Sequence, residues 1–403
     1  MNNFSHNFLS HKVQNLAESE TLAMAQLTND LKSKGVDVIN LSLGEPDFQT
    51  PAFICEAAKT AIDEGHHGYT PVAGELKLRQ LIAEKLKREN QIHVTAQQVV
   101  VSTGAKQCIA NLLISLLNDG DEVVLPAPYW VSYKDMAQFF GAKVVEVPSR
   151  LEDDFKIDAK TLDEYLSENS KIFLFSNPCN PSGTLYSKEE LESLLSVFER
   201  YPNLIIISDE IYEYIRFEDN FCSLASFPTI AQRVVTVNGL SKGFAMTGWR
   251  LGYLAAPLEI AKACSKVQSQ MTSGANAPTQ RAAMVALRAD GWRETQTMRE
   301  AFRQRRDHLI ALLSAIEGVE FNCPQGAFYL FPRIDYYLGK SYKGKVLSHS
   351  KDLALYLLEE AHVGLTPGGA FGCPEHIRLS YAVEENVLTD AVQRIDRALK
   401  LLQ

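Results

Sequence analysis

The segment at residues 238–253 places a lysine where nucleophilic chemistry is favoured. It reads N-G-L-S-K-G-F-A-M-T-G-W-R-L-G-Y, so Lys242 follows a strand-like apolar run and Arg250 comes eight positions later. A lysine at the end of a buried strand is poorly solvated, which lowers its pKa and makes it a better nucleophile. An isolated Ser-Lys pair is more often a surface loop, but the strand and the glycines around Lys242 weaken that alternative.

A second segment, S-D-E-I-Y-E-Y at residues 208–214, supplies an acid at a strand end. Asp209 follows an apolar run, and Tyr212 lies three residues further on. Pyridoxal phosphate needs such a carboxylate against its pyridine nitrogen, because a protonated nitrogen lets the ring act as an electron sink. The alternative is that Asp209 only caps a helix.

Two turns that follow strands could hold other parts of the same ligand. N-P-C-N-P-S-G at residues 177–183 forms a rigid turn, and Asn180 could donate to a phenolic oxygen. S-T-G-A-K-Q at residues 102–107 joins a strand to a helix, where exposed backbone N–H groups suit a phosphate. Those groups would come from Gly104, Ala105 and Lys106. Ordinary turn chemistry would also explain either segment.

Arg378 lies in H-I-R-L-S-Y-A, residues 376–382, near the C-terminus. A guanidinium binds a substrate carboxylate through two parallel hydrogen bonds. A lone arginine on a strand is more often a surface residue, so this assignment depends on the others.

The elements around these residues predict a doubly wound α/β domain. Short apolar runs suit strands buried on both faces of a parallel sheet, and helical patterns lie between them. Ligands of such sheets bind at the carboxyl ends of the strands. The strands are expected at residues 99–102, 122–125, 171–176, 204–208 and 234–237, and helices at 105–117, 188–198 and 260–271.

The sequence patterns at the two ends of the chain predict a second, smaller α/β domain. Residues 20–34 and 387–402 have helical patterns, and residues 327–331 and 377–381 resemble strands. We therefore expect the small domain to consist of residues 1–45 and 295–403, around a large domain at residues 46–294.

Composition excludes several classes of protein. With 46% hydrophobic and 22% charged residues the chain is typical of globular proteins, and a net charge of −9 argues against nucleic acid. The seven cysteines are scattered without a C-x-x-C pair, so neither disulfides nor a structural metal is expected. No apolar run suits a signal peptide or a membrane span, which predicts a cytoplasmic protein.

Taken in order, these motifs resemble those of the class I aminotransferases, and the bacterial aspartate aminotransferases in particular. The segments S-L-G-E-P-D-F (42–48), G-Y-T-P-V-A-G-E-L (68–76) and Y-W-V-S-Y (129–133) also match, so the likeness runs from about residue 12 to the end. The resemblance implies fold type I, with a large seven-stranded, mostly parallel sheet domain and a smaller domain from both termini. It also implies a homodimer with shared active sites.

For the cofactor, the resemblance implies that Lys242 forms the Schiff base with pyridoxal phosphate and then acts as the base for a 1,3-proton shift. Asp209 would pair with the pyridine nitrogen. Asn180 and Tyr212 would bond the ring oxygen, and Trp130 would stack on the ring face. The phosphate would be bound by Arg250, Gly104, Ala105, Lys106 and Tyr69 of the partner subunit.

For the substrate, the resemblance implies that Arg378 binds the α-carboxylate, with Gly44 and Asn180 completing the contact. Lys106 would bind the second carboxylate of a dicarboxylic substrate. The expected reaction is transfer of the amino group of L-aspartate to 2-oxoglutarate. Alternatives are an aromatic, alanine or prephenate aminotransferase, a β-lyase or decarboxylase of the same fold, or a cofactor-binding regulator, although we see no basic DNA-binding domain ahead of the fold.

Two features depart from the family pattern. Many relatives have a phosphate-binding serine three residues before the lysine, where this chain has Gly239, and Ser241 stands next to Lys242 instead. The segment at residues 367–376 is short, and the sequence leaves its conformation open.

Overall fold

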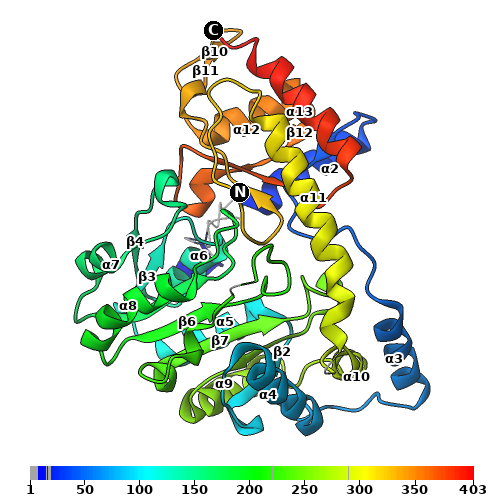
Figure 1. Ribbon diagram of the computed structural model, residues 1–403, viewed down its shortest axis with the longest axis vertical. Coiled ribbons are helices and arrows are strands. Elements are labelled where there is room, and N and C mark those ends of the chain that lie inside the picture. Colours follow the sequence, from blue (N-terminus) through cyan, green and yellow to red (C-terminus); the bar gives the residue numbers. More distant parts are fainter. Residues whose placement is uncertain (1–7, 15, 17–19, 220, 289) are drawn as a thin grey trace, which may run out of the picture.

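The computed structural model describes residues 8–14, 16, 20–219, 221–288 and 290–403, and its centre is a seven-stranded sheet (Figure 1). The strand order is β2-β8-β7-β6-β5-β3-β4, and only β8 runs antiparallel to its neighbours. This confirms the expected seven-stranded, mostly parallel sheet. The strands are β2 (Val99–Ser102), β3 (Glu122–Pro126), β4 (Lys143–Val147), β5 (Ser170–Ser176), β6 (Ile205–Asp209), β7 (Val234–Gly239) and β8 (Gly252–Ala255).

Helices cover both faces of this sheet, which is why its strands are apolar throughout. Successive residues of one strand enter different cores. Val123 packs with α5 (Ala105–Leu116) and α9 (Leu258–Met271), whereas Val124 packs with α7 (Ala159–Tyr165) and α8 (Lys188–Arg200). The helices of this layer are α3 (Ala52–Asp63), α4 (Leu76–Asn90), α5 (Ala105–Leu116), α6 (Ser132–Phe139), α7 (Ala159–Tyr165), α8 (Lys188–Arg200), α9 (Leu258–Met271) and α10 (Ala277–Ala286). A capping box formed by Ser187 and Glu190 begins α8.

A second body of structure is built from both ends of the chain. Here β13 (Thr366–Pro367), β14 (Ile377–Ser380) and β9 (Tyr329–Leu330) form one sheet, and β1 (Ile39–Asn40) pairs in parallel with β12 (Val363–Gly364). Also present are α1 (His11–Gln14), α2 (Glu20–Ser33), α11 (Thr295–Leu313), α12 (Ser350–Glu360), α13 (Glu385–Leu399) and the hairpin of β10 (Ser341–Tyr342) with β11 (Lys345–Val346).

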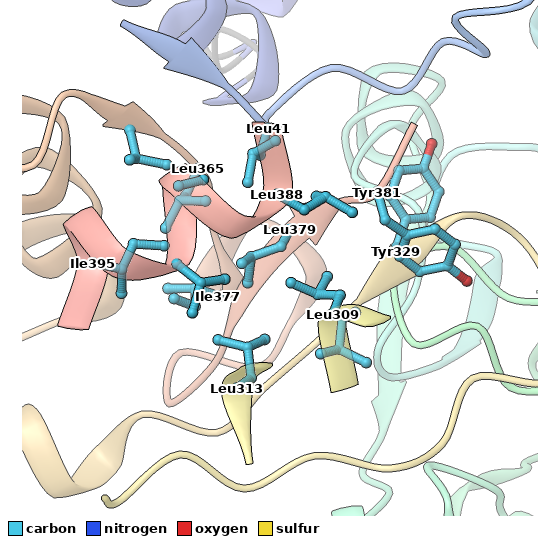
Figure 2. Close-up of a cluster of buried hydrophobic side chains, with 14 of the residues drawn as sticks. Leu41, Leu309, Leu313, Tyr329, Leu365, Ile377, Leu379, Tyr381, Leu388 and Ile395 are labelled. Atoms are coloured by element: carbon cyan, nitrogen blue, oxygen red, sulfur yellow. The ribbon is translucent and has the colours of Figure 1, made fainter. Parts of the chain in front are cut away.

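The core of this body gathers apolar side chains from distant parts of the chain. Figure 2 shows Leu41 beside Leu379 of β14 and Leu388 of α13, with Leu309 of α11 packed against them. The long helix α11 runs from this body down to the level of α10 (Figure 1). The division at residues 1–45, 46–294 and 295–403 stays a prediction, and residues 1–7, 15 and 17–19 of its first part lie outside the described ranges. None of the helices in those ranges is long and apolar enough to span a bilayer.

Candidate active site

A cavity of about 350 Å³ opens where the carboxyl ends of the central strands face the second body. Parallel strands bring their carboxyl ends to one edge of a sheet, so residues far apart in sequence meet there. The lining includes most of the residues singled out in the sequence: Gly44, Ala105, Lys106, Trp130, Asn180, Asp209, Tyr212, Ser241, Lys242, Arg250 and Arg378.

Lys242 lies in the turn after β7 and is half-buried at the base of the cavity. Its Nζ donates a hydrogen bond to the backbone carbonyl of Gly44. Burial lowers the pKa of Lys242 to about 8, and the charges of Arg378 and Arg250 act in the same direction, while Glu45 and Asp209 oppose them. About a tenth of the amine is therefore uncharged at pH 7, far more than for an ordinary lysine, and this is the state in which it can attack a carbonyl carbon.

Asp209 ends β6 with its carboxylate buried. Oδ2 accepts a hydrogen bond from the Tyr133 hydroxyl at 2.7 Å, and Oδ1 accepts one from the amide of Ile211 at 3.2 Å. Burial raises the pKa of Asp209 to about 6, while the two hydrogen bonds and the nearby Lys242 act against that rise. A buried carboxylate of this kind favours a cationic partner, such as a protonated ring nitrogen.

The start of α5 and Arg250 form a cradle at one end of the cavity. Gly104 has φ +90°, and a Cβ on it would overlap the Arg250 guanidinium. The amide of Gly104 already donates to the carbonyl of Ser102, at 2.8 Å. The first-turn amides of Ala105 and Lys106 have no partner within the helix, so they and the guanidinium remain to bind an anion.

Gly252 brings this cradle close to the sheet. A Cβ on Gly252 would overlap the amide nitrogen of Ala105. The glycine of the W-R-L-G-Y motif is therefore needed for α5 to begin so near β8.

Arg378 enters the cavity from β14 and is fully buried. Its Nη1 donates to Asn180 Oδ1 at 2.9 Å, and its Nη2 donates to the carbonyl of Ser42 at 2.7 Å. The guanidinium also lies 4.4 Å from the ring centroid of Tyr329. These contacts fix the guanidinium in one orientation, as recognition of a planar carboxylate requires.

Lys106 and Trp130 line another part of the wall. The Lys106 ammonium lies 4.8 Å from the centroid of the Trp130 ring. Burial and the charge of Arg250 lower the pKa of Lys106, so an anion that enters this part of the cavity would meet a partly desolvated cation.

The structure accounts for both departures from the family pattern. Gly239 is the last residue of β7, where a Cβ would stand 2.9 Å from the carbonyl oxygen of Leu251, so a serine does not fit. Ser241 is buried and lines the cavity. The short segment at residues 367–376 forms β13 and a single turn of 3₁₀ helix, Gly368–Phe371, whose last carbonyl accepts a hydrogen bond from the amide of Tyr129.

Of the predicted site residues, Gly104 and Tyr69 do not line the cavity: Gly104 lies against Arg250 at its edge, and Tyr69 lies away from it. The Tyr69 side chain is fully exposed on a loop beside Thr70 and Arg281. Within this chain it contributes nothing to the cavity.

The sequence analysis did not single out several residues that contribute to the site. Tyr133 contacts Asp209, and the Tyr329 hydroxyl lies 2.8 Å from that of Tyr212. Ser42 contributes only a backbone carbonyl, which no side-chain pattern reveals.

The model of the family described as aminotransferase class I and II matches residues 36–395. The chain belongs to the class I and II aminotransferases. It is 44% identical over 400 residues to an aspartate aminotransferase of Pinus pinaster, covering 98% of this chain and 81% of the relative. It is 42% identical over 392 residues to an aspartate/prephenate aminotransferase of Cereibacter sphaeroides, covering 96% and 98%.

Solved aminotransferase structures have the same fold. The aspartate aminotransferase of Rhizobium meliloti superposes with a TM-score of 0.93 at 38% identity, covering 98% of this chain and 99% of that one. The enzyme of Thermus thermophilus, determined with maleate, gives 0.91 at 37% identity, covering 98% and 100%. Membership of this aminotransferase family implies pyridoxal phosphate as cofactor.

Proposed function

We propose that this aminotransferase binds pyridoxal phosphate and transfers the amino group of L-aspartate to 2-oxoglutarate, giving oxaloacetate and L-glutamate. The main support is that one cavity brings together a lysine of lowered pKa, a buried carboxylate and two further cations, Arg378 and Lys106. The cofactor, when bound, supplies an electron sink that stabilises negative charge at the substrate Cα.

The cavity residues fit this cofactor. Lys242 would bond its aldehyde carbon, and Asp209 would hold its ring nitrogen in the protonated form. The glycine cradle at Gly104, with the amides of α5 and the Arg250 guanidinium, suits a phosphate. Asn180 and Tyr212 would donate to the ring oxygen, and Trp130 would cover the ring face.

Substrate binding needs one cation for each carboxylate. Arg378 would bind the α-carboxylate, together with Asn180 and the backbone at Gly44. Lys106 would bind the distal carboxylate, which only a dicarboxylic substrate has. The maleate in the Thermus thermophilus structure is also a dicarboxylate. Lys242, whose lowered pKa favours the uncharged amine, would accept and return the proton at the substrate Cα.

We predict that Lys106→Ala or Lys106→Ser lowers kcat/KM for aspartate and glutamate selectively. Loss of one charged hydrogen bond to a desolvated carboxylate costs about 2–4 kcal/mol, or about one and a half to three decades in rate. Alanine and phenylalanine have no distal carboxylate, so their kcat/KM should change little. The measurement is kcat/KM for these four donors with 2-oxoglutarate.

Exposed Lys262 of α9 offers a control, since Lys262→Ala should leave all four values unchanged. An equal fall for every donor, together with weaker cofactor retention, would instead mean that Lys106 only neutralises the phosphate.

Prephenate is a second candidate acceptor. It is named for the Cereibacter sphaeroides relative and for the bifunctional enzyme of Petunia hybrida, which is 45% identical over 395 residues. Prephenate carries two carboxylates, so Arg378 and Lys106 could bind it as they would bind 2-oxoglutarate. Assaying both acceptors with glutamate or aspartate as donor distinguishes a single from a dual activity.

We further propose a homodimer in which Tyr69 of the partner subunit reaches the phosphate. The support is the full exposure of Tyr69 here and its position in the matched G-Y-T-P motif. Mixing inactive Lys242→Ala subunits with inactive Tyr69→Arg subunits should restore activity, because one site of each heterodimer is then intact. We expect about a quarter of wild-type activity, from random pairing, measured after co-refolding. Full activity of a Tyr69→Arg homodimer, or of an isolated monomer, would contradict shared sites.

A further inference from the structure

Tyr133 is a buried residue that contacts two walls of the cavity without lining it. It lies on α6, one turn after Trp130, with no exposed surface. Its hydroxyl donates to Asp209 Oδ2 at 2.7 Å, and its ring meets that of Trp130 edge-on, with centroids 5.4 Å apart and planes at 86°. One side chain thus contacts both the proposed ring-nitrogen carboxylate and the proposed stacking ring.

The hydroxyl can only act as a donor in this contact. Burial, followed by the charge of Asp209, raises the pKa of Tyr133 well above its ordinary value, so the hydroxyl keeps its proton over the pH range of an enzyme assay. An ionised carboxylate can only accept. Asp209 Oδ1 is already satisfied by the amide of Ile211, and Tyr133 is the side-chain donor that we find for Oδ2 among the described residues.

Removing that donor would leave only the amide of Ile211 and the charge of Lys242 to oppose the effect of burial on the pKa of Asp209. The titratable groups that face it are Tyr133 from α6, Lys242 from the turn after β7, Cys108 from α5 and Tyr212 from its own segment. Of these, Tyr133 and Lys242 favour the ionised carboxylate, whereas the thiol and the second phenol give it no positive charge.

We propose that Tyr133 is a positioning residue that holds the Asp209 carboxylate ionised and in one orientation for the ring nitrogen of the cofactor. This inference rests on the proposed function, since it concerns the same cofactor. Tyr133 does not touch the reacting atoms and acts through Asp209.

The test measures pyridoxal phosphate affinity, apart from turnover. Apoenzymes of the wild type and Tyr133→Phe are titrated by equilibrium dialysis from pH 6 to pH 9. In the variant the pKa of Asp209 should rise by at least one unit, because the hydroxyl that opposed burial is gone. Binding that needs the ionised carboxylate should then weaken at least about threefold near pH 6.5, because a rise of the pKa from about 6 to about 7 lowers the ionised fraction from about three quarters to about one quarter. Near pH 9 the carboxylate is ionised in both proteins, so the two affinities should agree within about twofold.

Tyr356→Phe is the matched control. Tyr356 is also buried and donates its hydroxyl, to the carbonyl of Ala398 at 2.7 Å, but it lies far from the cavity in α12. Its removal should leave cofactor affinity unchanged at every pH. Thermal unfolding of both variants checks that any difference in affinity does not reflect partial unfolding.

A double-mutant cycle separates an effect through Asp209 from a general packing defect. In an Asp209→Asn background, Tyr133→Phe should add less than about a twofold loss in affinity, because the group that it supports is absent. Equal affinities of Tyr133→Phe and wild type across the pH range, or an unchanged loss in the Asp209→Asn background, would overturn the inference. Failure of the wild type itself to bind the cofactor would instead overturn the proposed function.

Discussion

Lys242→Ala is expected to lower aminotransferase kcat by about four decades or more, because the variant loses both a nucleophile and a proton carrier, each a large contribution. Lys242 combines burial at the cavity base, a pKa of about 8 and a hydrogen bond to the Gly44 carbonyl. Lys106 also lines the cavity, but its ammonium lies against Trp130 and so does not stand in for Lys242.

The same variant gives a chemical readout. Borohydride reduction should attach the cofactor covalently to the wild type, on the peptide that contains Lys242, and should leave Lys242→Ala unlabelled. Lys262→Ala should behave as the wild type in both experiments. Turnover at the wild-type rate in Lys242→Ala would refute the central assignment.

Arg378→Lys is expected to lower kcat/KM by about thirtyfold to several thousandfold for every amino donor. Truncating one partner of a buried charged pair costs about 2–5 kcal/mol, and each 1.4 kcal/mol is tenfold. A lysine has no planar pair of donors, so it cannot keep Asn180 Oδ1 and the Ser42 carbonyl while binding a carboxylate in parallel. Because every amino acid has an α-carboxylate, the loss should not discriminate between aspartate and phenylalanine.

The control for this variant is Arg394→Lys. Arg394 pairs with Asp390 and Asp37 away from the cavity. It should leave kcat/KM unchanged, and the cofactor absorbance of Arg378→Lys should match that of the wild type. A loss confined to dicarboxylic donors would show that Arg378 and Lys106 have exchanged the roles assigned to them.

Sequence patterns located most of the central sheet, because buried parallel strands read as continuous apolar runs. They gave no bounds for β8 and missed β4. The latter lies at the sheet edge, where Val144 and Val145 are only partly buried and stand between Lys143 and Glu146. The expected strand at residues 327–331 is reduced to Tyr329–Leu330, and Ala327 has φ +57°. Short strands of this kind owe their register to tertiary packing, which a local pattern does not contain.

The sequence also predicted most of the side chains that line the candidate site, but not all of the contacts that hold them in place. Lys242, Asp209 and Asn180 each follow a strand, and topology alone sends strand ends to one edge. Contacts made by backbone atoms, such as the carbonyls of Ser42 and Gly44, have no side-chain signature. The same holds for Tyr133, whose role depends on a buried neighbour 76 positions away.

The hydrogen bond from Arg378 to the carbonyl of Ser42 joins residues 336 positions apart. The contact between these residues can therefore form only when nearly the whole chain has been synthesised, because the chain emerges from the ribosome at a limited rate and distant contacts form late. Over that interval the cavity around Lys242 lacks Arg378. Completion of the carboxylate-binding part of the cavity is thus expected only after synthesis, and a nascent chain stalled before residue 378 should not turn over amino acids.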